Sequence, residues 1–120
     1  MKKKMKKLEP NQIKCLSENF KEIVFNNDFD FVYEEQVPNS AILLLDGELL
    51  LCKKNKIIES IHPGSLLGAY QLLHNEPVKL ACKIGRKSKA ILLNKTALLE
   101  SLKDETSPLF EIIHQLQIES

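Results

Sequence analysis

Short apolar segments separated by turn residues fill the middle of the chain, and they restrict the fold more than any other feature. Six segments have the length and composition of β-strands; they lie at 31–33, 41–45, 48–53, 56–61, 78–84 and 90–93. The pairs Asp46-Gly47 and Lys54-Asn55 favour hairpin turns, and 38–40 favours a loop. Short antiparallel strands at this spacing predict a β-sandwich or a rolled barrel.

Helical periodicity precedes this region. Apolar residues recur at mostly three- and four-residue intervals over 8–25, where they are Leu8, Ile13, Leu16, Phe20, Ile23 and Val24. With Pro10 suited to the first turn, this pattern predicts an amphipathic helix of about three turns. The polar residues at 26–28 are expected to end it.

Two further helices are expected after the strands. Asn94 can cap the first, and the residues at 106–108 suit the start of the second. The apolar residues are Leu98, Leu99 and Leu102 in the first helix, and Leu109, Ile112, Ile113 and Leu116 in the second. The predicted fold class is therefore mainly β, with one N-terminal helix, one inserted helical turn and two C-terminal helices.

The charge distribution argues against several functions. Five of the 17 basic residues lie within 1–7, so the rest of the chain carries 12 basic and 16 acidic groups. We therefore expect a Lys-rich, flexible segment at 1–7 and a single domain over 8–120, not a globally basic nucleic-acid binder. The alternative for the Lys-rich segment is contact with an anionic surface. No apolar run approaches the roughly 18 residues of a membrane span, and no signal peptide precedes the domain, so we expect a cytoplasmic protein.

Cysteine and histidine spacing argues against a metal, a cofactor or catalysis. The three cysteines (Cys15, Cys52 and Cys82) and the three histidines (His62, His74 and His114) are widely separated. Neither set fits a disulfide framework or a zinc site. Because no nucleophile is spaced with a base, we expect no catalytic residue and no enzyme. The cysteines of the predicted strands are expected to fill small buried positions.

The segment 63–73 has the pattern of a phosphate-binding turn followed by a short helix. Gly64 and Gly68 allow a sharp turn and a close approach of the backbone to a ligand, and the amides of the following helical turn could point at an anion. We expect these glycines, like Gly47, to have a structural role. A carboxylate or a guanidinium that would bind the rest of such a ligand is missing.

The order of these elements resembles the cyclic nucleotide-binding domain, the β-roll of catabolite-activator-type regulators, cyclic-nucleotide-dependent kinases and gated channels. One stretch that carries the resemblance is 32–49, with sequence VYEEQVPNSAILLLDGEL, in which Glu35 stands where the family prefers Gly. The other is 61–68, with sequence IHPGSLLG, which is similar to the opening of the family's phosphate-binding cassette. The two motifs occur in the family's order and spacing.

The resemblance implies a degenerate ligand pocket. In the family, a Glu binds the ribose and an Arg pairs with the cyclic phosphate; the matching positions here are Ala69 and Val78, with Lys79 beside the latter. The pocket implied by the resemblance comprises Gly64, Leu67, Gly68, Ala69, Tyr70, Val78 and Lys79. Loss of two charge-assisted contacts at about 1.5–3 kcal/mol each would weaken binding by roughly two to four orders of magnitude.

Two functional hypotheses follow. The first is a non-enzymatic regulatory module that has lost cyclic nucleotide binding and acts through a protein partner or a homodimer. Because no sequence follows Ser120, we expect no DNA-binding, kinase or channel segment. Its expected contact surface comprises Leu109, Phe110, Ile112, Ile113 and Leu116, although the helix could instead pack on its own roll. The second is a sensor of cyclic AMP, cyclic GMP or another anion, bound by the amides of 68–70 and Lys79, with Tyr70 stacked on a base or simply lying on the surface.

Overall fold

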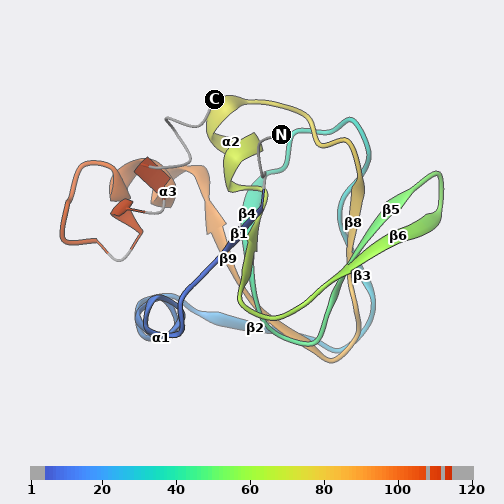
Figure 1. The fold of residues 1–120 in the computed structure, drawn as a ribbon, viewed down its shortest axis with the longest axis horizontal. Helices are drawn as coiled ribbons and strands as arrows, with labels where there is room; N and C mark the ends of the chain where they lie inside the picture. The colour runs from blue at the N-terminus through green and yellow to red at the C-terminus, as the bar shows by residue number, and fades with distance from the viewer. Residues whose placement is uncertain (1–4, 108, 112, 115–120) are drawn as a thin grey trace.

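Two antiparallel sheets form the body of the protein (Figure 1). The computed structural model describes residues 5–107, 109–111 and 113–114. The five-stranded sheet has the order β1-β7-β4-β9-β2 and the four-stranded sheet the order β3-β8-β5-β6. The strands are β1 Met5–Lys7, β2 Glu22–Phe25, β3 Phe29–Val32, β4 Ser40–Asp46, β5 Leu49–Lys53, β6 Lys56–Ile61, β7 Ser65–Leu67, β8 Ala81–Ile84 and β9 Ser88–Asn94. The helices are α1 Pro10–Asn19, α2 Ala69–His74 and α3 Lys95–Ser101.

The five-stranded sheet is covered on both faces. Because side chains alternate along a strand, β4 contributes Ala41 and Leu43 to one core and Ile42 and Leu44 to another. The first core, called here the helical-side core, also contains residues of α1, α2 and α3. The second, called the roll interior, lies between the two sheets and includes Val32, Leu49, Ile61, Cys82, Ile84 and Ala90. The mainly β fold class is therefore confirmed.

The N-terminal helix ends earlier in the chain than expected. α1 ends at Asn19, and the residues from Glu22 to Phe25 form β2, which pairs with β9 (Figure 1). The prediction of a helix over 8–25 was wrong for its last turns. Adjacent β-branched Ile23 and Val24 fit a strand well, and pairing with β9 provides main-chain hydrogen bonds that local periodicity cannot reveal.

Residues 5–7, which we expected in a flexible segment, form β1 against β7. The Lys7 ammonium donates a hydrogen bond to the Pro63 carbonyl at 2.7 Å. The Leu8 amide donates to the Gly64 carbonyl at 2.8 Å. These contacts fasten the start of the described chain to the glycine turn.

The two predicted hairpin turns have different outcomes. Lys54 and Asn55, with φ of 52° and 66°, connect the paired strands β5 and β6 and confirm the second hairpin. Asp46-Gly47 does not form a hairpin, because β4 and β5 belong to different sheets. It is the corner at which the chain crosses from one sheet to the other.

The C-terminal part agrees with the expected caps. The Asn94 side chain accepts a hydrogen bond from the Ala97 amide at 2.7 Å, and the Ser107 hydroxyl accepts one from the Leu109 amide at 3.2 Å. Pro108, Ile112 and Leu116 lie outside the described residues. Within the described part of the chain, no helix has the length and apolar character needed to cross a membrane.

Candidate functional site

The glycine segment folds as the expected turn and short helix. Gly64 donates its amide to the Leu44 carbonyl at 2.8 Å, and β7 then leads into α2 through Gly68. Gly68 has a φ of +88°, and a Cβ there would lie 3.3 Å from the Ser40 carbonyl oxygen. The position therefore favours glycine for both its backbone conformation and its close contact with the start of β4.

Ala69, which the resemblance matches to the family's ribose-binding Glu, belongs to the helical-side core and is only 1% exposed. Tyr70 is 5% exposed, and its ring packs on His74 with centroids 4.4 Å apart. The interpretation of Tyr70 as a surface ring was therefore wrong, whereas stacking on a base stays a prediction. At both positions the side chain serves the packing of α2.

Val78 is the residue that the resemblance matches to the family's phosphate-binding Arg. It lies in the loop before β8, not in the strand that we expected to begin there. Its amide donates to the Gln36 carbonyl and its carbonyl accepts from the Glu35 amide, both at 2.8 Å. Its half-buried side chain packs on the roll interior, as does Leu67, and Lys79 is exposed. The side chain of Val78 thus makes apolar contacts with the roll interior.

The sequence did not indicate Gln71. It lies on α2 and is 9% exposed, and its side-chain oxygen has no hydrogen-bond partner among the described residues. A buried acceptor without a donor is costly, by about 1–3 kcal/mol. A glutamine in a helical segment is usually exposed, so no local pattern marks it.

Titratable and metal-ligating groups do not gather at this segment. Among the described residues, no group of three or more His, Cys, Asp or Glu side chains could hold a metal ion. The thiol of Cys82 faces the roll interior, where burial, followed by the nearby thiol of Cys52, raises its pKa to about 12. Cys82 therefore fills a small buried position as expected, whereas Cys52 is half-buried.

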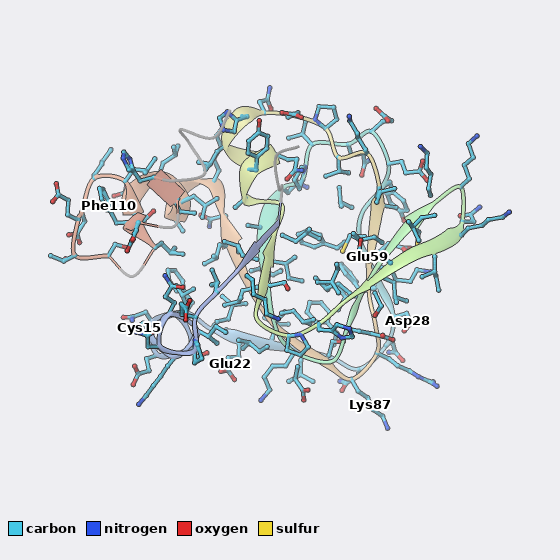
Figure 2. All side chains as sticks on the ribbon, viewed as in Figure 1. Cys15, Glu22, Asp28, Glu59, Lys87 and Phe110 are labelled. Carbon is cyan, nitrogen blue, oxygen red and sulfur yellow. The ribbon has the colours of Figure 1, made fainter. Side chains whose placement is uncertain are left out.

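Two of the three described residues of the expected contact surface are buried. Leu109 and Ile113 are 1% and 0% exposed and belong to the helical-side core. Phe110 is half-buried, and its ring stacks on His114 with centroids 5.6 Å apart. It lies beside α3, on the side of the molecule away from the β5–β6 hairpin (Figure 2). Of the five residues, only Phe110 presents a described apolar side chain to solvent.

Solved structures of cyclic nucleotide-binding proteins share this fold. The structure described as Sp-2Cl-cAMPS bound to PKAR CBD2 has a TM-score of 0.64 at 21% identity, over 90% of this chain and 71% of that chain. The catabolite activator protein of Thermus thermophilus has a TM-score of 0.67 at 14% identity, over 93% and 54%. The regulatory subunit of a cAMP-independent protein kinase A from Trypanosoma cruzi, bound to guanosine, has a TM-score of 0.58 at 16% identity, over 80% and 38%. No family model and no curated protein matches the sequence.

The chain therefore has the β-roll fold of cyclic nucleotide-binding domains. It corresponds to about half the length of the catabolite activator protein and to 71% of the first of these structures. At identities of 21% or less, these likenesses establish the fold. Ligand and partner have to be argued from the residues of this chain.

Proposed function

We propose that this protein is a non-enzymatic regulatory module that has lost tight cyclic nucleotide binding and acts through protein interaction. The observation that carries the proposal is the pair of apolar residues at the two charged family positions, Ala69 in the helical-side core and Val78 against the roll interior. A cyclic phosphate placed there would lose its guanidinium partner, and the ribose would lose its carboxylate. The three free cysteines fit a reducing compartment such as the cytoplasm.

Isothermal titration with cyclic AMP and cyclic GMP, each taken to millimolar concentration, tests the loss of binding. We expect no saturable heat from either nucleotide. A dissociation constant below about 10 μM, equivalent to about −6.8 kcal/mol, would contradict the proposal. Guanosine in the same experiment separates loss of the phosphate contact from loss of the whole pocket.

A second candidate function is recognition of an uncharged ligand, such as a nucleoside. Two observations support it: the unpartnered oxygen of Gln71 could accept a hydrogen bond from a ligand, and one structure with this fold holds guanosine. The anion-binding version of this hypothesis has less support, because Lys79 is exposed in a loop and Tyr70 is buried. The test is the thermal shift with guanosine, measured on the wild type and on Gln71→Leu. A shift of equal size in both proteins would exclude Gln71 as the contact.

A further inference from the structure

The strand β6 forms an outer edge of the four-stranded sheet. β5 pairs with one side of β6, and no strand pairs with its other side in the part of the chain that the structure describes. An edge strand presents a row of main-chain donors and acceptors that another extended segment can use. The β5–β6 hairpin also projects from the body of the protein, away from α1 and α3 (Figure 1).

The side chains of this edge are unusually apolar for a solvent-facing strand. Ile57 and Ile58 are 63% and 58% exposed, the highest values among the described large hydrophobic residues. Ile57 pairs with Cys52 and Glu59 pairs with Leu51, so Ile58 is an extra residue without an opposite number on β5. Two adjacent β-branched residues at an open edge are costly to leave in water, and they are suited to pack on an added strand.

The hairpin tip supplies positive charge beside these isoleucines. Lys53, Lys54 and Lys56 are all exposed around the turn. The Glu34 carboxylate accepts a hydrogen bond from the Lys54 amide at 2.6 Å, which holds the tip against the turn after β3. Glu34 and Glu59 only partly offset the three lysines. Lysines discourage unselective edge pairing, and they also select a partner with carboxylates.

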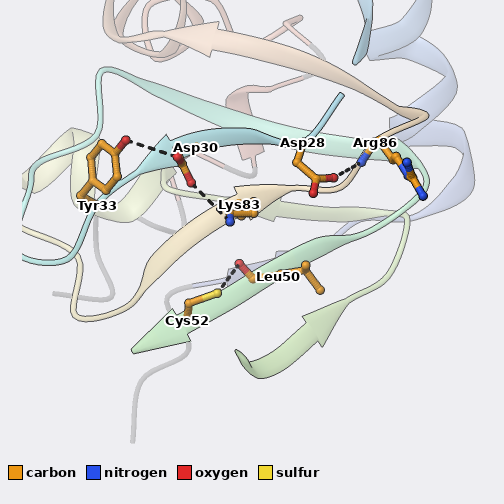
Figure 3. Close-up of polar contacts among 7 residues, drawn as sticks. All are labelled: Asp28, Asp30, Tyr33, Leu50, Cys52, Lys83 and Arg86. Carbon is orange, nitrogen blue, oxygen red and sulfur yellow. Dashed lines mark hydrogen bonds and ion pairs between the residues drawn. The ribbon is translucent and has the colours of Figure 1, made fainter. Parts of the chain in front are cut away.

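Beside the β5–β6 hairpin, the outer side of the sheet carries polar groups that already contact one another. The Tyr33 hydroxyl donates to Asp30 at 3.3 Å, and Asp30 lies 3.9 Å from the Lys83 ammonium (Figure 3). The Arg86 amide likewise donates to Asp28 at 2.9 Å (Figure 3). Phe29 of β3 is also 50% exposed, but among the described strands only β6 combines two adjacent exposed apolar side chains, Ile57 and Ile58, with an open edge beside the hairpin lysines.

We propose that β6 binds an extended, acidic segment of a partner protein, which adds to the four-stranded sheet as a further strand. This inference rests on the proposed interaction function and specifies its surface. A second copy of the chain fits less well, because its own β6 would bring a single carboxylate, Glu59, to this lysine-rich edge. A lipid surface would leave the main-chain groups of the edge without partners.

Selection from a library of random 12-residue peptides displayed on phage tests the proposal. Peptides selected on the wild-type protein should be rich in Asp, Glu and β-branched residues. Synthesised peptides should slow amide exchange within 56–61 at least fivefold. They should bind the Ile57→Glu/Ile58→Glu variant at least tenfold more weakly. The matched control is Val24→Glu, because Val24 is 56% exposed on β2, an edge strand of the other sheet; this change should alter affinity less than twofold.

A second variant keeps the test decisive if the isoleucine variant does not fold. Lys53→Glu/Lys56→Glu alters only exposed side chains, and it should weaken acidic peptides at least tenfold. Failure to select any peptide, or peptides that both variants bind normally, would overturn the edge proposal. So would Ile57-dependent self-association, or Ile57-dependent binding to phosphatidylserine vesicles without peptide binding.

The outcomes also separate this inference from the proposed function. Peptides that bind away from β6 would leave an interaction module in place but remove its assigned edge. Tight cyclic nucleotide binding together with β6-dependent peptide binding would overturn the loss of ligand binding and leave the edge intact.

Discussion

The three thiols lie in environments so different that the reactivity of each can be measured separately. Cys15 is exposed, Cys52 is half-buried and Cys82 is buried with its pKa raised from 9.0 to about 12. We expect iodoacetamide at pH 8 to alkylate Cys15 first and Cys52 next. Because three pKa units correspond to about a thousandfold less thiolate, Cys82 should react only after unfolding. Mass spectrometry of timed samples checks this order, and early labelling of Cys82 would contradict its burial.

The same thiol links stability to pH. Its pKa is higher in the folded protein than in the unfolded chain, so the unfolded chain binds fewer protons above pH 9. The contribution of Cys82 is therefore fully present below pH 9 and is lost as the pH rises toward 12. The Cys82→Ala variant should lose less stability than the wild type between pH 8 and 10, measured by urea unfolding. An identical loss in both proteins would argue against the raised pKa.

Glu35 adopts a backbone conformation that favours glycine, with a φ of 66°. Replacing an L-residue in this region with glycine relieves about 1–2 kcal/mol of strain and costs about 0.4–1 kcal/mol of unfolded-state entropy. We expect Glu35→Gly to stabilise the protein by about 0.5–1 kcal/mol in urea unfolding. The matched control is Glu34→Gly, which should destabilise because the Glu34 carboxylate accepts a hydrogen bond from Lys54. Destabilisation by Glu35→Gly would show that the turn needs its side chain.

At the scale of elements, the corner between β4 and β5 depends on Gly47. It has a φ of +90°, and a Cβ there would lie 2.7 Å from the Ser88 Cα atom, which is backbone and cannot move away cheaply. Gly47→Ala should therefore cost about 2–4 kcal/mol of stability. Gly64→Ala is the control, since its Cβ would meet only side-chain ends, those of Lys7 at 3.4 Å and Ile13 at 3.5 Å; we expect about 1–2 kcal/mol there. Equal losses of thermal stability in the two variants would show that the close contact with Ser88 costs nothing beyond the strained backbone conformation.

The start of α3 depends on one side chain. Asn94 is the last residue of β9, and its side chain caps α3 by accepting a hydrogen bond from the Ala97 amide. Asn94→Ala should cost about 1 kcal/mol, and Asn94→Asp should retain most of the capping effect. Chemical denaturation of the two variants measures the difference. If Asn94→Ala unfolds at the same denaturant concentration as the wild type, the cap does not contribute to the stability of the protein.

For the whole molecule, the two cores limit which side chains positions 69 and 78 can accept. Ala69 is 1% exposed in the helical-side core, so Ala69→Glu would bury a carboxylate without a partner. We expect a loss of about 3–5 kcal/mol and no gain of cyclic nucleotide binding, even when it is combined with Val78→Arg. Urea unfolding and calorimetric titration of the double variant check both expectations. A folded double variant that binds cyclic AMP would show that the pocket needs only its two charges.

Much of the fold follows from local patterns. The strands near 41–45, 48–53 and 56–61, the Lys54-Asn55 turn and the Asn94 cap depend on residues close together in the chain, and they were predicted correctly. The candidate site was predicted less well. The glycine turn was located, but the burial of Tyr70 and the unpartnered oxygen of Gln71 depend on what packs against α2 from elsewhere.

The sequence by itself determined the central strands near 41–45, 48–53 and 56–61, the Lys54-Asn55 turn between two of them and the cap of α3, because these features arise from backbone conformation and side-chain polarity within a short segment. Only the tertiary structure decided which sheet each strand joins, that the residues after α1 pair with β9, and that β6 is left at an edge. The physical reason is that strand partners are chosen by main-chain hydrogen bonds and packing between segments far apart in the chain, and a local window of sequence contains neither.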